Sequence, residues 1–245
     1  MPKLIRSRPA AACALALVLL LSVVSVASAR KVRADLRVVG KAGKVLSEQS
    51  LFTGSTKVPT SPRATCFGKG TGGSGKAAAI NGPTALGLLS QAARKTTALK
   101  PLLVTDAFDF GLGICGVGGF SATKTLSWYL KVNHKNPERS GELVKLKPGD
   151  EVLWALAGYP YPKELALEAP AEATPGVPFI VRVASYDDKG KRKPVKGALV
   201  TGGAGPTDSK GRTTVTLARP ANLQATDARD IPSNTAAVCV AALCP

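Results

Sequence analysis

The sequence contains a single histidine, His134, and no Cys-x-x-Cys pair. Structural zinc sites combine Cys and His ligands at short spacings, so these shortages argue against a metal site. A Ser-His-Asp hydrolase needs its serine in an elbow such as Gly-x-Ser-x-Gly, which does not occur here. We therefore predict no metal, no cofactor, no catalytic residues and no enzymatic activity. His134 is interpreted as a surface residue at the tip of a polar hairpin.

Three other catalytic patterns are incomplete. The glycine run Gly70–Lys76 nearly spells a phosphate-binding loop, but Ala77 stands where the magnesium-holding hydroxyl should be. The segment Ser121–Lys124 matches Ser-x-x-Lys but lacks the companion motifs of serine acyl-enzymes. Asp106 and Asp109 could form a carboxylate pair, but no second cleft wall is identifiable, so a capping or turn role is favoured. These segments are predicted to be loops and turns.

The first 29 residues are predicted to be a secretory signal. Lys3, Arg6 and Arg8 give a positive start, a run of Ala, Leu and Val follows over Ala10–Val26, and small residues close it at Ala27–Ala29. This order is typical of a signal peptide cleaved near Ala29, and the apolar run is short for a membrane span. We expect an exported protein that is extracellular or associated with the cell wall.

Acidic residues are scarce relative to basic ones. Cleavage would leave 30 of the 33 Lys and Arg residues against all 16 Asp and Glu residues, a net charge of +14. Such an excess attracts polyanions through salt-screened fields. Outside the cell, nucleic acid is not an expected partner, whereas anionic cell-wall polymers are. The alternative is an unspecific, solvated basic surface. The candidate anion-binding residues cluster on predicted hairpins: Lys131, Lys135, Arg139, Lys145, Lys147, Lys191, Arg192 and Lys193.

Four cysteines remain after the predicted cleavage, an even number that indicates two disulfides in an exported chain. Of the three connectivities, we favour Cys66–Cys115 and Cys239–Cys244. The long loop would gain about 4 kcal/mol and the short one about 2 kcal/mol. Residues five apart on one strand lie roughly 16 Å apart, so the second bridge requires residues 241–243 to turn.

The remaining length suits two domains, at 30–158 and 159–245, with a boundary near the prolines of Tyr159–Pro162. The first has one convincing helix over Thr84–Arg94, with Thr84 as its N-cap. The strands predicted there are 35–39, 43–51, 101–105, a short one around Ile114, 126–132, 141–146 and 151–156. The last two flank a tight turn at Lys147–Asp150 and would form a hairpin.

The second predicted domain has no helix signal. Phe179, Val181 and Val183 alternate with polar residues, and a turn follows at Asp187–Gly190. Further short strands are predicted at 198–201, 212–217, 223–226 and 236–241. Short strands at this spacing favour a sandwich of immunoglobulin type.

Three motifs carry a family resemblance: the helix Thr84–Leu89, the strand Ser127–Asn133 and the segment Lys147–Trp154. Together they make 35–157 resemble a bacterial domain of unknown function that is related to the C-terminal domain of transcobalamin and intrinsic factor. The second domain is similar to bacterial immunoglobulin-like modules, on the basis of Thr207–Arg212 leading into Thr213–Leu217. The resemblances imply an α+β domain, strand-rich with one helix, followed by an all-β immunoglobulin-like sandwich.

Cobalamin binding does not follow from this resemblance. In the vertebrate carriers the ligand lies between that domain and a helical barrel, which has no counterpart in this sequence, and a site must be argued from its own residues. The leading hypothesis is therefore a non-enzymatic binding protein of the cell envelope that engages anionic surface polymers. The alternative is an extracellular carrier of a small, corrinoid-like ligand, for which Phe67, Trp128 and Tyr129 offer a candidate aromatic surface.

Overall fold

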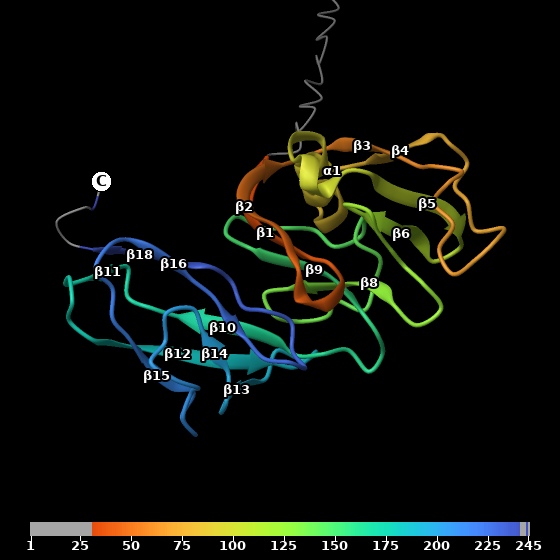
Figure 1. Cartoon of the computed structure of the whole chain (residues 1–245). Helices are drawn as coiled ribbons and strands as arrows, with labels where there is room; N and C mark the ends of the chain where they lie inside the picture. The colour runs from red at the N-terminus through yellow and green to blue at the C-terminus, as the bar shows by residue number, and fades with distance from the viewer. Residues whose placement is uncertain (1–30, 241–243, 245) are drawn as a thin grey trace, which may run out of the picture.

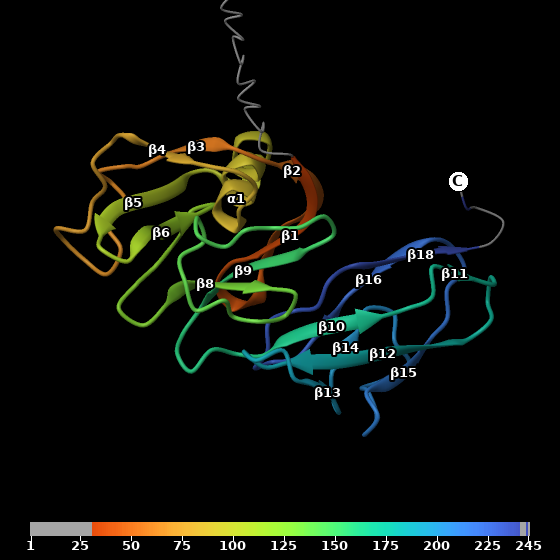
Figure 2. The same ribbon diagram turned by 180° about the vertical axis from the view of Figure 1, so that it is seen from behind.

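The computed structural model describes residues 31–240 and 244. This part of the chain is mostly β-structure with a single α-helix, α1 (Ala85–Lys95). The predicted signal at residues 1–29 lies outside the described residues. None of the described helices is long and apolar enough to cross a membrane. Two lobes, residues 31–158 and 159–240, lie side by side in both views (Figures 1 and 2).

Helix α1 begins and ends close to the predicted residues. Thr84 has extended backbone angles, and its Oγ1 accepts a hydrogen bond from the Gly87 backbone N–H at 3.0 Å, so it is the N-cap. Leu86, Leu88 and Leu89 are fully buried in the core of the first lobe. The prediction of this helix is confirmed.

The central sheet of the first lobe has the strand order β2-β1-β9-β8. Strands β1 (Val32–Val39) and β9 (Glu151–Ala157) are parallel neighbours, whereas β2 (Val45–Thr53) and β8 (Ser127–Val132) pair in antiparallel register at the two edges. Both faces of β9 are buried. On one face, the side chains of Val152, Trp154 and Leu156 pack in the same core as α1, as the alternation predicts. On the other face, Leu153 packs in a separate cluster with Ile231 of the second lobe.

The prediction of a strand over 141–146 is wrong. Strand β9 already has β1 on one side and β8 on the other, so neither edge is left for a hairpin partner. The segment instead forms turns, with an isolated bridge between Lys145 and Thr84. Glu142 in this segment accepts a hydrogen bond from the Leu112 backbone N–H at 2.8 Å.

The other elements of the first lobe cover the remaining surface of the core. Strands β3 and β4 form one antiparallel pair, and β5, β6 and β7 form a three-stranded sheet. Their bounds, with the two short 3-10 helices, are β3 (Thr56–Pro59), β4 (Ala77–Ile80), β5 (Leu102–Phe108), β6 (Gly111–Val117), β7 (Phe120–Ser121), η1 (Lys41–Gly43) and η2 (Thr97–Leu99).

The second lobe is built from short strands in three small sheets, and its described residues contain no α-helix. Strands β10, β12 and β13 are neighbours with β15 pairing β12, strands β11, β18 and β16 form a second sheet, and β14 pairs β17. The bounds are β10 (Glu164–Glu168), β11 (Glu172–Ala173), β12 (Phe179–Tyr186), β13 (Arg192–Pro194), β14 (Leu199–Val200), β15 (Arg212–Val215), β16 (Ala221–Leu223), β17 (Ala225–Thr226) and β18 (Ala236–Val240).

Both favoured cysteine pairs lie at disulfide distance. Cys66 and Cys115 have an S–S distance of 2.02 Å and form a small buried cluster with Ala64. Cys239 and Cys244 are joined at 2.10 Å. The turn predicted over 241–243 lies outside the described residues. Disulfides persist in oxidising compartments, so the pairs suggest an extracellular environment.

Candidate functional site

The basic hairpins of the two lobes meet at the junction between them. Lys135, in the loop after β8, forms an isolated antiparallel bridge with Lys189, in the turn between β12 and β13. The backbone N–H of Asn136 donates to the Asp188 carbonyl oxygen at 2.9 Å. The Lys135 side chain also lies over Gly190, since a Cβ added there would be 2.7 Å from its Cγ. Two clusters that are 54 residues apart in the sequence therefore form one continuous surface.

We call the exposed side chains Lys135, Lys189 and Lys191 the junction lysines. The nearby acidic side chains are engaged by other groups. Asp187 accepts hydrogen bonds from the backbone N–H groups of Lys189 and Lys191 at 3.0 and 2.8 Å, and these bonds hold its pKa below the usual range. Asp188 accepts the hydroxyl proton of Tyr129. The junction lysines have no ion-pair partner among the described residues.

The predicted anion-binding residues divide into two groups. Lys131 is fully buried, and Nζ donates to the carbonyl oxygens of Tyr186 and Asp187 at 2.9 and 3.0 Å. Burial lowers its pKa, although Glu164 and Asp188 oppose the shift. Lys131 therefore links the two lobes, and its buried ammonium group is not accessible to an external polymer. The other seven are exposed: Lys135, Arg139, Lys145, Lys147, Lys191, Arg192 and Lys193.

Some of the exposed cations are committed to contacts within the chain. Arg192 pairs with Glu168 on the neighbouring surface of β10, and Lys145 donates to the Asn81 carbonyl oxygen. Arg139 lies at the rim of an aromatic cleft in the first lobe. Lys147 and Lys193 are also exposed and have no ion pair among the described residues. Lys135 and Lys191 differ from them in their position: with Lys189, they lie where the hairpins of the two lobes meet.

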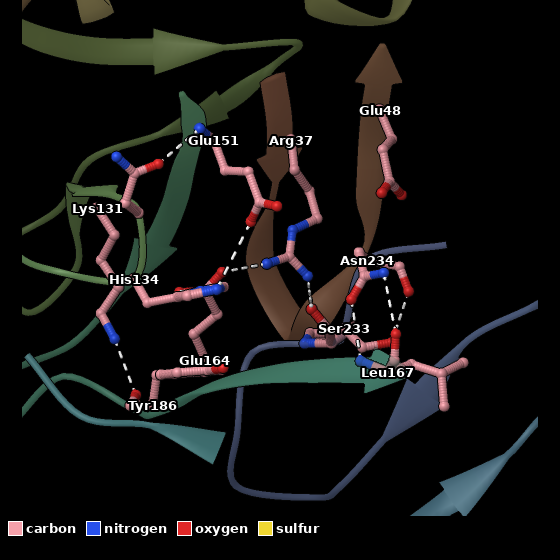
Figure 3. Close-up of polar contacts among 12 residues, drawn as sticks. Arg37, Glu48, Lys131, His134, Glu151, Glu164, Leu167, Tyr186, Ser233 and Asn234 are labelled. Atoms are coloured by element: carbon pink, nitrogen blue, oxygen red, sulfur yellow. Dashed lines mark hydrogen bonds and ion pairs between the residues drawn. The ribbon is translucent and has the colours of Figure 1, made fainter. Parts of the chain in front are cut away.

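A buried ion pair ties the two lobes together beside this surface (Figure 3). Arg37 on β1 pairs with Glu164 on β10, and its second terminal nitrogen donates to the Pro232 carbonyl oxygen at 2.5 Å. The Glu164 carboxyl is 3% exposed. Burial by itself raises its pKa, but the contacts with His134, Arg37 and Lys131 outweigh that effect and lower the pKa below its usual range.

The interpretation of His134 as a surface residue at a hairpin tip is wrong. Its ring stacks on Tyr186 with centroids 3.8 Å apart and planes 9° from parallel, and 22% of its side chain is exposed. Nδ1 lies 3.1 Å from Glu164 and Nε2 lies 3.6 Å from Glu151. The hairpin is covered by the second lobe, which sequence periodicity in the first lobe does not reveal. Figure 3 shows the ring held between the two carboxylates.

These residues line a polar cavity of about 550 Å³ between the lobes. Its lining carries charges of both signs: the cations Arg37 and Lys131, and the carboxylates of Asp35, Glu48, Glu151 and Glu164. Arg37 and Glu164 pair across the lobe junction. The arrangement accounts for how the second lobe is fixed against the first, and hence for the fixed spacing of the junction lysines.

A second cavity, of about 600 Å³, is lined mostly by residues of the first lobe, with Tyr161 contributed by the second. The three residues predicted as an aromatic ligand surface, Phe67, Trp128 and Tyr129, all line it. Trp128 and Tyr129 are buried in the floor, whereas Phe67 is 48% exposed. We call this cavity the aromatic cleft; the aromatic residues that line it are Phe67, Phe108, Phe110, Trp128, Tyr129, Trp154 and Tyr161.

No protein-family model, curated protein or solved structure matches this chain. The function must therefore be argued from the geometry of the junction surface and the cleft.

The sequence patterns missed several residues of these two sites. Phe110, which no sequence motif singled out, is 67% exposed and stacks on Phe108, with ring centroids 4.8 Å apart. Tyr161, stacked on Tyr129 at 4.0 Å, lies in the segment read only as a linker. The Tyr-Pro-Tyr-Pro composition of that segment was a usable signal, because exposed tyrosines often mark binding surfaces. No sequence signal pointed to Glu164.

Asp106 has the local role that the sequence favours. Its carboxylate accepts hydrogen bonds from the backbone N–H and the hydroxyl of Ser74, both at 2.6 Å. These bonds lower the pKa of Asp106. Asp106 thus holds the glycine-rich loop over 66–75 against β5.

Proposed function

We propose that this protein is a non-enzymatic, exported binding protein of the cell envelope that engages anionic surface polymers. The observation that carries the proposal is the contact between Lys135 and Lys189, which merges basic hairpins from both lobes into one surface. Cations gathered on one surface attract a polyanion more strongly than scattered cations do, because several charges of the polymer are met at once.

The location of the protein is part of the proposal. Two disulfides favour an oxidising compartment, and the segment Met1–Ala29 has the charge and hydropathy order of a cleaved signal. We also propose that the first lobe is a transcobalamin-like domain and that the second is an immunoglobulin-like sandwich. In this arrangement the second lobe acts as a spacer and supplies half of the basic surface.

The proposal is tested by adsorption of the purified protein to isolated cell walls over a range of salt concentrations. The variant K135A/K189A/K191A removes the junction lysines. Each basic side chain near an anionic surface is worth about 1 kcal/mol, so the triple variant should bind on the order of a hundredfold more weakly at low salt. The bound wild-type protein should be released as salt is raised, because ions screen the attraction.

A matched control separates a local surface from net charge alone. The variant K57A/K95A/K210A removes three exposed lysines that lie away from the junction and lowers the net charge by the same amount. We expect it to keep most of the wild-type affinity. Equal losses in both variants would reduce the effect to overall charge, and no adsorption of wild-type protein at low salt would rule out the proposed function.

A further inference from the structure

The aromatic cleft presents ring faces to solvent in a way that core packing does not explain. Phe110 and Phe67 are exposed for 67% and 48% of their surface, and Leu143 beside them is 55% exposed. Exposed apolar side chains that gather around one cavity mark ligand-binding sites in soluble proteins. The cavity volume of about 600 Å³ lies within the roughly 300–1,000 Å³ range of such sites.

The rings are held in place without a ligand. Phe108 and Phe110 stack with planes 13° apart, and Tyr129 and Tyr161 stack with planes 19° apart. Phe67 follows the disulfide-bonded Cys66 and has a φ of +59°, a left-handed conformation that a bulky residue seldom adopts. Such conformations persist where the surrounding structure fixes them, often at ligand sites.

The lining of the cleft also includes polar residues. Asn136, Glu138, Arg139 and Ser140 line it, and the Glu138 backbone N–H donates to the Asn136 side chain at 2.9 Å. These residues add hydrogen-bond donors and acceptors to the aromatic lining. A ligand with hydroxyl groups can use them, whereas a hydrocarbon chain cannot.

The cleft adjoins the junction lysines. Tyr129, in its floor, donates its hydroxyl proton to Asp188, and the Asn136 backbone N–H bonds to the Asp188 carbonyl oxygen at 2.9 Å. Asn136 also follows Lys135 directly in the chain. A ligand that extends out of the cleft over Asn136 therefore reaches the basic surface.

We infer that the aromatic cleft is a sugar-binding site that holds pyranose rings of an acidic polysaccharide, while the junction lysines bind its charged groups. A pyranose ring has an apolar face of C–H groups and a rim of hydroxyls, which match the aromatic rings and the polar residues of the lining respectively. The basic surface beside the cleft supplies the charge complementarity. The inference rests on the proposed function and names the chemical class of its polymer.

The test compares three probes by isothermal titration calorimetry with the intact purified protein. A galacturonate oligosaccharide carries both sugar rings and negative charge, a linear polyphosphate of matched charge carries no sugar, and a neutral galactose oligosaccharide carries no charge. The galacturonate oligosaccharide should bind most tightly. Its binding should also change the tryptophan fluorescence, because Trp128 lies in the floor of the cleft.

The variant F110A removes an exposed ring of the cleft, and F52A removes an equally accessible phenylalanine on β2 that does not line it. F110A should weaken galacturonate binding about two- to tenfold, leave polyphosphate binding unchanged and keep the wild-type unfolding curve. F52A should match the wild type with every probe.

The outcomes separate the two proposals. Equal binding of galacturonate and polyphosphate, with no effect of F110A, would overturn the sugar site and leave the electrostatic function standing. Binding of the neutral sugar as tight as that of the galacturonate oligosaccharide, weakened by F110A, together with no binding of polyphosphate at low salt, would support the cleft and contradict the polyanion function. Tight binding of cobalamin, or of anionic lipid vesicles in an F110A-dependent manner, with no response to the sugars, would assign the cleft to a different ligand.

Discussion

Replacing Glu164 by Gln should loosen the junction between the lobes. Glu164 is 3% exposed and lies against Arg37, whose side chain is 9% exposed. A glutamine has almost the same shape but no charge. It therefore leaves the Arg37 guanidinium buried without its counter-ion, while the bond from Arg37 to the Pro232 carbonyl oxygen remains.

The expected cost follows from the burial of both partners. Removing one member of a buried ion pair typically costs about 3–5 kcal/mol, because the other charge is left uncompensated in a poorly solvated site. Since Arg37 keeps one strong acceptor, the lower end applies, about 3 kcal/mol. The same substitution at Glu168, on the same strand, breaks an exposed pair with Arg192 and should cost less than about 1 kcal/mol.

The loss should depend on pH in a defined direction. The pKa of Glu164 is lower in the folded state than in the unfolded chain, where it is about 4.3. The carboxylate therefore stabilises the fold above that pH, and this contribution is lost as pH falls through the folded-state pKa. The difference in stability between wild type and E164Q should be full at pH 7 and should shrink below about pH 4.

Urea unfolding followed by circular dichroism at pH 7 and at pH 3 measures both effects. The double variant R37M/E164L serves as a further check, because replacing both charges by apolar groups should recover much of the loss. A loss at E164Q no larger than at E168Q, or one that does not change with pH, would refute the assignment of this pair as the contact that fixes the lobes.

The structure also predicts the cost of losing a disulfide and a helix cap. The variant C66A/C115A should lose about 4 kcal/mol of unfolding free energy, because this bridge closes a long loop with a sequence separation of 49. The short Cys239–Cys244 bridge should contribute about 2 kcal/mol, so equal losses in urea titrations of the two double variants would contradict the loop-length argument. Thr84→Ala should cost about 1 kcal/mol through loss of the bond to Gly87, and Thr84→Ser should restore it. Identical melting of both Thr84 variants would show that the cap bond does not contribute.

Local features of the fold could be predicted because local residues specify them. Thr84 ahead of an apolar helical pattern places α1, and the structure confirms it. The prediction of a strand over 141–146 failed because alternation identifies a segment that is able to pair. It does not show whether a sheet edge is open to that segment. The neighbours of β9 are β1 and β8, and β1 joins it from more than 100 residues away in the sequence.

The residues of the candidate site also divide into those that the sequence predicted and those whose burial only the structure showed. Phe67, Trp128 and Tyr129 were selected as a set by their residue type, and the structure places all three around one cavity. Lys131 and His134 were selected as exposed polar residues of a hairpin, and both are instead covered by the second lobe. A periodic pattern reports which face of a strand is apolar, and it carries no information on what packs against a polar face.

The sequence by itself determined the excess of basic charge, the helix, the even number of cysteines left after the predicted cleavage and the residues available for a site. Tertiary structure decided which of these residues are buried and which are exposed. It joined Lys135 to Lys189 and paired Arg37 with Glu164 across 127 positions of the chain. The physical reason is that burial of a charge depends on long-range contacts. Lys131 becomes buried, and Lys135 joins the basic hairpin of the second lobe, only once the second lobe is in place.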